Sequence, residues 1–161
     1  MEKKQLNKSK YLFYGLIAFI VISGFLQDFF MKNINLVLKH ITTGLTNYSV
    51  PLFYPLEDWT VAQIYLLKWV LTIFWMIYFW TLSFFTLRVY FKPRGISVRA
   101  INYVYLILFG LAGILYVTGW VFGIGNTMYH IVRTLTGLTN SFMPVLIVFL
   151  FLNYFPKEAE N

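Results

Sequence analysis

The stretch that decides the fold is INYVYLILFGLAGILYVTGWVF, residues 101–122, which carries no charged residue. A helix needs about 20 apolar residues to cross the hydrocarbon core of a bilayer. Three further stretches are similarly apolar, at residues 11–31, 69–87 and 141–155. The last has only 15 residues, so its helix is expected to begin upstream or to be completed by neighbouring helices. The sequence therefore predicts four membrane-spanning helices.

The composition agrees with a membrane protein. Of 161 residues, 59% are hydrophobic and only 12% are charged, whereas a soluble domain carries about 25% charged residues. This charge deficit excludes a soluble globular domain and a disordered tail, and the absence of cysteine excludes a disulfide scaffold. We therefore expect an all-α integral membrane protein, with residues 1–161 forming a single membrane domain.

The distribution of lysine and arginine predicts the orientation. The basic residues before the first span suggest a signal peptide, but the apolar run is long and no small-residue cleavage site follows it, so we expect a retained helix. One face receives nine lysines and arginines, at positions 3, 4, 8, 10, 88, 92, 94, 99 and 157, and the other receives four, at positions 32, 39, 68 and 133. The positive-inside rule then places both tails, residues 1–10 and 157–161, in the cytoplasm of a bacterial cell, with the spans in its inner membrane. The basic residues do not cluster on one face of a folded domain, so the sequence does not indicate nucleic-acid binding.

A five-residue motif occurs twice. Thr43–Asn47 and Thr136–Asn140 both read TGLTN, and a proline follows four residues after each copy, at Pro51 and Pro144. This duplication predicts two tandem repeat units, about 11–90 and 99–156. Each unit holds two spans, so both units point the same way, as a parallel 2+2 repeat with TGLTN on the outer face.

The segment before each TGLTN copy carries apolar residues at helical spacing, at 34, 37, 38, 41 and 45 and again at 128, 131, 132 and 135. This pattern predicts short amphipathic helices on the outer face before spans two and four. The glycine of TGLTN is expected to end each helix, and Asn47 or Asn140 to cap the next element. The motif is then either a helix stop and restart or a paired polar site; that site would consist of Thr43, Thr46, Asn47, Thr136, Thr139 and Asn140.

The two histidines, His40 and His130, occupy matching places in the repeat. Their position favours a role at the membrane interface. The alternative is that the two imidazoles bind one metal ion or haem iron together. Arg133 is expected to face headgroups and to join the outer-face polar or partner site. The sequence has no Cys nucleophile and no catalytic or phosphate-binding motif. We therefore predict no catalytic residue, no cofactor and no metal site.

Two charges lie closest to the membrane, Asp28 and Lys68. They are candidates for an intramembrane ion pair, although Lys68 can also reach headgroups by snorkelling. Thr60-x-x-Gln63 fits a capping box, which predicts a helix start before Lys68. Gly119-x-x-x-Gly123 is a small-x3-small pattern, which predicts close helix packing.

The C-terminal unit carries a resemblance. Residues 129–133 read YHIVR, and residues 141–145 read SFMPV before an apolar helix. This arrangement resembles the small multi-span proteins encoded beside bacterial exosortases, over about 30 residues and with a loose motif. The resemblance implies an accessory subunit without activity of its own, with Arg133 and Pro144 as the matched positions. Exosortases themselves use a Cys nucleophile, which this chain lacks.

Three functions remain open from the sequence. The favoured one is a non-enzymatic accessory or assembly subunit of a larger envelope membrane complex, including a protein-sorting one. The second is an oligomeric channel or carrier for a small solute or ion. The third is a His-dependent redox or lipid-active membrane enzyme. The expected partners are the lipid bilayer and either another membrane protein or a second copy of the chain.

Overall fold

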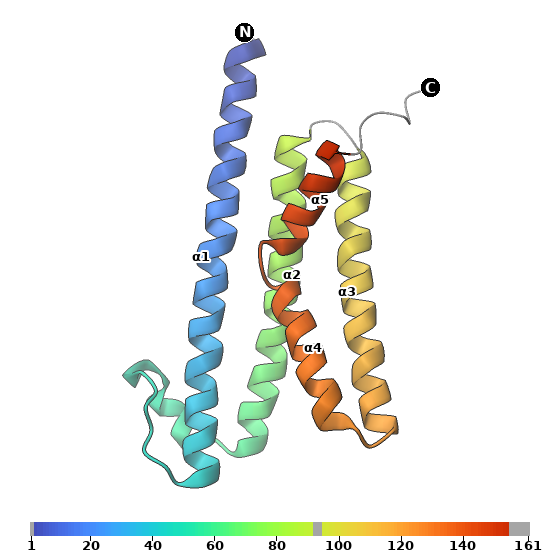
Figure 1. Ribbon diagram of the computed structural model, residues 1–161. Helices are drawn as coiled ribbons and strands as arrows, with labels where there is room; N and C mark the ends of the chain where they lie inside the picture. The colour runs from blue at the N-terminus through green and yellow to red at the C-terminus, as the bar shows by residue number, and fades with distance from the viewer. Residues whose placement is uncertain (1, 92–94, 155–161) are drawn as a thin grey trace. The chain divides into compact units, whose positions relative to one another are not determined.

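The computed structural model describes residues 2–91 and 95–154, with the side chains of residues 2–8, 95–98, 125, 126 and 129 left aside. Every regular element in these ranges is helical (Figure 1). The elements are α1 (Glu2–Thr43), the 3₁₀ helix η1 (Pro51–Asp58), α2 (Val61–Tyr90), α3 (Gly95–Val121), α4 (Gly125–Thr139) and α5 (Met143–Tyr154).

Three helical segments are long and apolar enough to cross a membrane, at Ser9–Thr43, Val61–Tyr90 and Arg99–Val121. A fourth candidate is a broken span or a re-entrant loop: His130–Thr139 and Met143–Tyr154 qualify together, with a bend of 61° between them. This confirms the all-helical prediction over the described residues, with three candidate membrane spans, or four when the bent pair counts as one. If the bent pair forms one span, the short fourth stretch gains its length upstream, from α4. The 2+2 repeat stays a prediction.

The first expected outer helix is not a separate element, because residues 34–43 continue α1 without a break. No proline or glycine occurs between Met31 and Thr43 to interrupt the hydrogen-bond ladder. The start of α2 follows its predicted capping box. The backbone N–H of Thr60 donates to Gln63 Oε1 at 2.9 Å, and the N–H of Gln63 donates to Thr60 Oγ1 at 3.4 Å.

The two TGLTN copies have different conformations. In the first, α1 ends at Thr43, and Gly44 has a φ of 67° while its N–H donates to the carbonyl of His40 at 2.8 Å. That positive φ favours glycine, so the predicted helix stop is confirmed here. In the second, α4 runs through Gly137 to Thr139, so the same prediction is wrong. Neither asparagine caps a following helix as expected: Asn140 is the C-cap of α4, and Val50 precedes η1.

The described chain divides into two compact units, and each has its own packing. Unit 1 comprises Met1–Val21 and Tyr78–Asn161, and unit 2 comprises Ile22–Ile77. In unit 1, the rings of Phe13, Tyr90 and Phe149 meet, with centroids 4.6 to 5.2 Å apart. These contacts join the first turns of α1 to the end of α2 and to α5.

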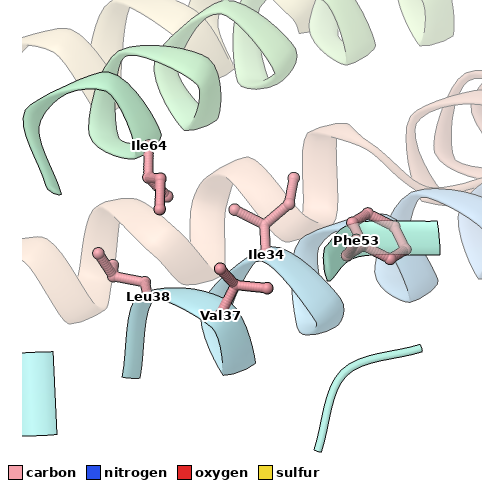
Figure 2. Packing of buried hydrophobic residues seen from close by; sticks show 5 residues of the cluster. All are labelled: Ile34, Val37, Leu38, Phe53 and Ile64. Carbon is pink, nitrogen blue, oxygen red and sulfur yellow. The ribbon is translucent and has the colours of Figure 1, made fainter. Parts of the chain in front are cut away.

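Unit 2 has a core built from α1, η1 and α2. Figure 2 shows its five buried residues, Ile34, Val37, Leu38, Phe53 and Ile64. Phe53 is the only buried residue of η1, and its ring lies against α1. The apolar stripe that predicted a separate amphipathic helix therefore forms this core, which holds the segment between α1 and α2 in place.

Candidate functional site

The break between α4 and α5 gathers polar side chains from several helices of unit 1. Ser83 of α2 and Tyr105 of α3 are joined by a hydrogen bond between their hydroxyls at 2.8 Å. The hydroxyl of Tyr105 also donates to the backbone carbonyl of Thr139, at 3.4 Å, where α4 ends. All three side chains are buried. With Asn140 they form what we call the α4–α5 site.

Asn140 is the unusual member of the α4–α5 site. Only 4% of the residue is exposed, and neither Oδ1 nor Nδ2 has a hydrogen-bond partner among the described residues. Its backbone is satisfied, since the N–H donates to the carbonyl of Thr136 at 2.9 Å. A buried polar group without a partner costs about 1–3 kcal/mol. The amide offers both a donor and an acceptor, so a water molecule, a hydroxyl or another amide would complement it.

The α4–α5 site lies within the apolar segments of its helices, which are candidate membrane spans. Ser83 precedes the exposed Arg88 by five residues, and Tyr105 follows the exposed Arg99 by six. At 1.5 Å per residue these hydroxyls lie about 8–9 Å inside the charged ends of their helices. Irregular backbone at such depth occurs where protein buries it or where it lines a water-filled cavity. The buried state of Asn140 and Pro144 fits the first condition.

The equivalent asparagine of the first copy has partners. In unit 2, Asn47 Nδ2 donates to Glu57 Oε1, and Asn47 Oδ1 accepts from the N–H of Ser49 at 2.8 Å. At the same distances along the second copy stand Phe142 and Leu150. The second copy thus has no carboxylate at the position that Glu57 occupies after the first, and its asparagine amide is buried without a partner among the described residues.

The threonines of TGLTN mostly bond within their own helices. Thr43 Oγ1 donates to the carbonyl of Lys39 at 2.7 Å, and Thr136 Oγ1 donates to the carbonyl of Val132 at 2.8 Å. Thr139 does the same with Leu135, also at 2.8 Å. Thr46 is exposed in the loop after α1. The two copies belong to different compact units, so a paired polar site stays a prediction.

The remaining predicted residues have separate places. His40 Nδ1 hydrogen-bonds to the carbonyl of Leu45 and so secures the end of α1, while His130 and Arg133 are exposed on α4. In the described part of the chain, no three or more His, Cys, Asp or Glu side chains are grouped to hold a metal ion.

Asp28 is exposed on α1, and Lys68 Nζ lies 5.6 Å from the ring centre of Tyr65. The ion pair between Asp28 and Lys68 stays a prediction. The Gly119–Gly123 pair does not share a helix face, because Gly123 follows the end of α3 with a φ of 69°. Its N–H donates to the carbonyl of Trp120 at 3.4 Å, so this glycine closes the turn before α4.

A second feature of unit 1 is one face of α3. Asn102, Leu106, Gly110, Gly113 and Val117 recur at helical spacing, and all five are exposed. A Cβ placed at either glycine would meet nothing within 4 Å among the described residues. Asn102 Oδ1 accepts from Trp80 Nε1 at 3.0 Å, and its Nδ2 group has no partner in the described chain. We call these five residues the α3 face.

Sequence reasoning identified Thr139 and Asn140 but missed Ser83 and Tyr105. Isolated hydroxyls inside apolar runs were the only available signal, and such residues are common in membrane helices. No known protein family, curated protein or solved structure matches this chain. The functional conclusion therefore depends on the two features of unit 1.

Proposed function

We propose that this chain is a non-enzymatic accessory or assembly subunit that joins another membrane protein in an envelope complex. The observation that carries the proposal is the α3 face, where two exposed glycines lie in line with an exposed asparagine amide. The absence of catalytic motifs from the sequence supports the same conclusion.

Membrane helices associate where small residues let two backbones come close and where polar side chains hydrogen-bond across the contact. Glycine within a helix is less stable than alanine by about 0.5–1 kcal/mol. Packing inside the described chain does not require Gly110 or Gly113, because the space beside each is open. A helix of a partner protein would use that space, and the Nδ2 donor of Asn102, which has no partner among the described residues, would bind one of its acceptors.

Pulldown from native membranes in mild detergent, with crosslinking, tests the proposal. We expect Gly110→Leu to remove most of the copurified partner, because a leucine side chain fills the close approach. Leucine favours the helix more than glycine does, so lost association would not report unfolding. Gly15→Leu on α1 is the matched control, since Gly15 is also exposed with no atom near its Cβ position.

Isolation of the native chain as a lone monomer would refute the proposal, as would an unchanged partner yield with Gly110→Leu. Copies carrying two different tags separate self-association from binding to another protein. The resemblance of residues 129–145 to exosortase-associated proteins makes an exosortase-type complex the first partner to seek. Arg133→Ala, on the exposed surface of α4, tests that particular partner.

A second candidate function is an oligomeric channel or carrier for a small solute or ion. It is favoured by one observation, the divided crossing of α4 and α5 with the unpaired amide of Asn140 at the break. Discontinuous helices form substrate and ion sites in many transporters. Flux of Na⁺, K⁺ and H⁺ into proteoliposomes tests this function. Flux that Asn140→Leu abolishes would support it, and flux no higher than in protein-free vesicles would count against it.

A further inference from the structure

The segment between α1 and α2 forms a hairpin, which we call the η1 hairpin and define as residues 44–58. Its first arm leaves the end of α1 and its second arm is η1. Asn47 Nδ2 donates to Glu57 Oε1 and joins the two arms away from the tip. The tip is then formed by residues 50–54. Figure 1 shows this segment folding back along the last turns of α1.

Two contacts fix the tip against α1. The backbone N–H of Val50 donates to Asn33 Oδ1 at 2.8 Å. The ring of Phe53 lies 6.0 Å from that of Phe29 and 5.6 Å from that of Phe30, between centroids. The tip is therefore level with residues 29–33 of α1, about 15–20 Å back along the helix from Thr43 at 1.5 Å per residue.

The positions of the charged residues lead us to place the membrane boundary of unit 2 near that level. The apolar run of α1 ends at Met31 and is followed by the exposed Lys32. Helix α2 gives the same boundary independently. Its Ile64 packs with Ile34 and Leu38 of α1, and α2 runs toward the membrane from there. Lys68, one turn further along α2, is therefore close to the level of Lys32.

The exposed side chains of the η1 hairpin differ in charge between its tip and its other end. At the tip, Val50, Leu52 and Tyr54 are 41%, 69% and 46% exposed. At the other end of η1, Glu57 and Asp58 are exposed and lie next to the start of α2, beyond the boundary on the water side. The exposed side chains at the tip are thus uncharged, and the two carboxylates occupy the other end, where Leu45 and Trp59 are also exposed.

We infer that the tip of the η1 hairpin inserts into the lipid at the membrane face where α1 ends. The tip contacts the boundary between lipid headgroups and acyl chains. This region accepts leucine side chains and the amphipathic ring of tyrosine. The buried Phe53 anchors the tip to α1, and its two exposed neighbours, Leu52 and Tyr54, contact lipid. The hairpin therefore fixes how deeply unit 2 sits in the membrane.

Spin labelling measures the depth directly, because the chain has no native cysteine. We would introduce Leu52→Cys, and separately Tyr54→Cys, into the full chain and reconstitute it in nanodiscs of phosphatidylethanolamine and phosphatidylglycerol. Collision rates with oxygen, which concentrates in lipid, and with a nickel chelate, which stays in water, then report depth. Thr46→Cys on the first arm is the aqueous control, and Ile107→Cys on α3 is the lipid control.

We expect the oxygen-to-nickel ratio at Leu52 and Tyr54 to be several-fold above that at Thr46 and below that at Ile107, which lies deeper in the apolar part of its helix. A ratio equal to that of Thr46 would overturn the inference, since the tip would then be in water. Low collision rates with both reagents would also overturn it, because protein and not lipid would then cover the tip. Two labelled positions keep the test decisive if one substitution disturbs the hairpin.

Discussion

Replacing each TGLTN asparagine with leucine is expected to change stability in opposite directions. Asn140→Leu removes an amide whose Oδ1 and Nδ2 are both buried without a partner in the described chain. Asn47→Leu removes an amide that makes two hydrogen bonds, to Ser49 and to Glu57. The substitution is the same at both positions and keeps the number of side-chain heavy atoms, and the local sequence is identical.

The magnitudes follow from hydrogen bonding. A buried polar group without a partner costs about 1–3 kcal/mol, and a satisfied hydrogen bond contributes about 0.5–1.5 kcal/mol. Asn140→Leu should therefore raise the free energy of unfolding by about 1–3 kcal/mol. Asn47→Leu should lower it by about 1–2 kcal/mol, because two bonds are lost at a residue that is only half-buried.

Equilibrium unfolding in mixed micelles, with increasing dodecyl sulfate and helicity followed by circular dichroism, measures both changes. Because the chain has two compact units, each variant should also be followed by amide hydrogen exchange, which assigns the change to its own unit. A loss of stability in Asn140→Leu similar to that in Asn47→Leu would refute the reasoning. It would mean that a bound water molecule or partner already satisfies the buried amide.

Three further predictions concern single contacts. Gly44→Ala should lower the free energy of unfolding by about 1 kcal/mol, because Gly44 has a φ of 67°. Gly137→Ala, within α4, should instead raise it by about 0.5–1 kcal/mol. The dodecyl sulfate titration measures both changes. Tyr105→Phe removes the hydroxyl that is hydrogen-bonded to Ser83 and should lower the free energy of unfolding by about 1–2 kcal/mol. A double-mutant cycle with Ser83→Ala should give a coupling energy of about 0.6 kcal/mol, the average for hydrogen bonds between membrane helices. Phe53→Ala should cost the η1 hairpin about 3–5 kcal/mol, so exchange of the amides of residues 44–58 should rise while the α3 amides stay protected.

Much of the architecture was predictable because it depends on length and hydropathy. The apolar runs at residues 11–31 and 69–87 each lie within a helix that can span a membrane, and the run at 101–122 does so up to Val121. The capping box at Thr60 and Gln63 was also predictable, since both its bonds form within one helical turn. In contrast, the pairing of Ser83 with Tyr105 joins residues 22 apart in sequence, on neighbouring helices. Nothing local to either residue specifies that contact.

The sequence by itself determined that this protein belongs in a membrane, because a chain with 12% charged residues has too little polar surface to cover itself in water. It also located the three long apolar helices, since backbone groups in hydrocarbon must be satisfied within the helix. Only the tertiary structure decided what each TGLTN copy does. The same five residues end α1 in unit 2 and continue α4 in unit 1, because glycine permits both conformations and the surrounding packing selects between them.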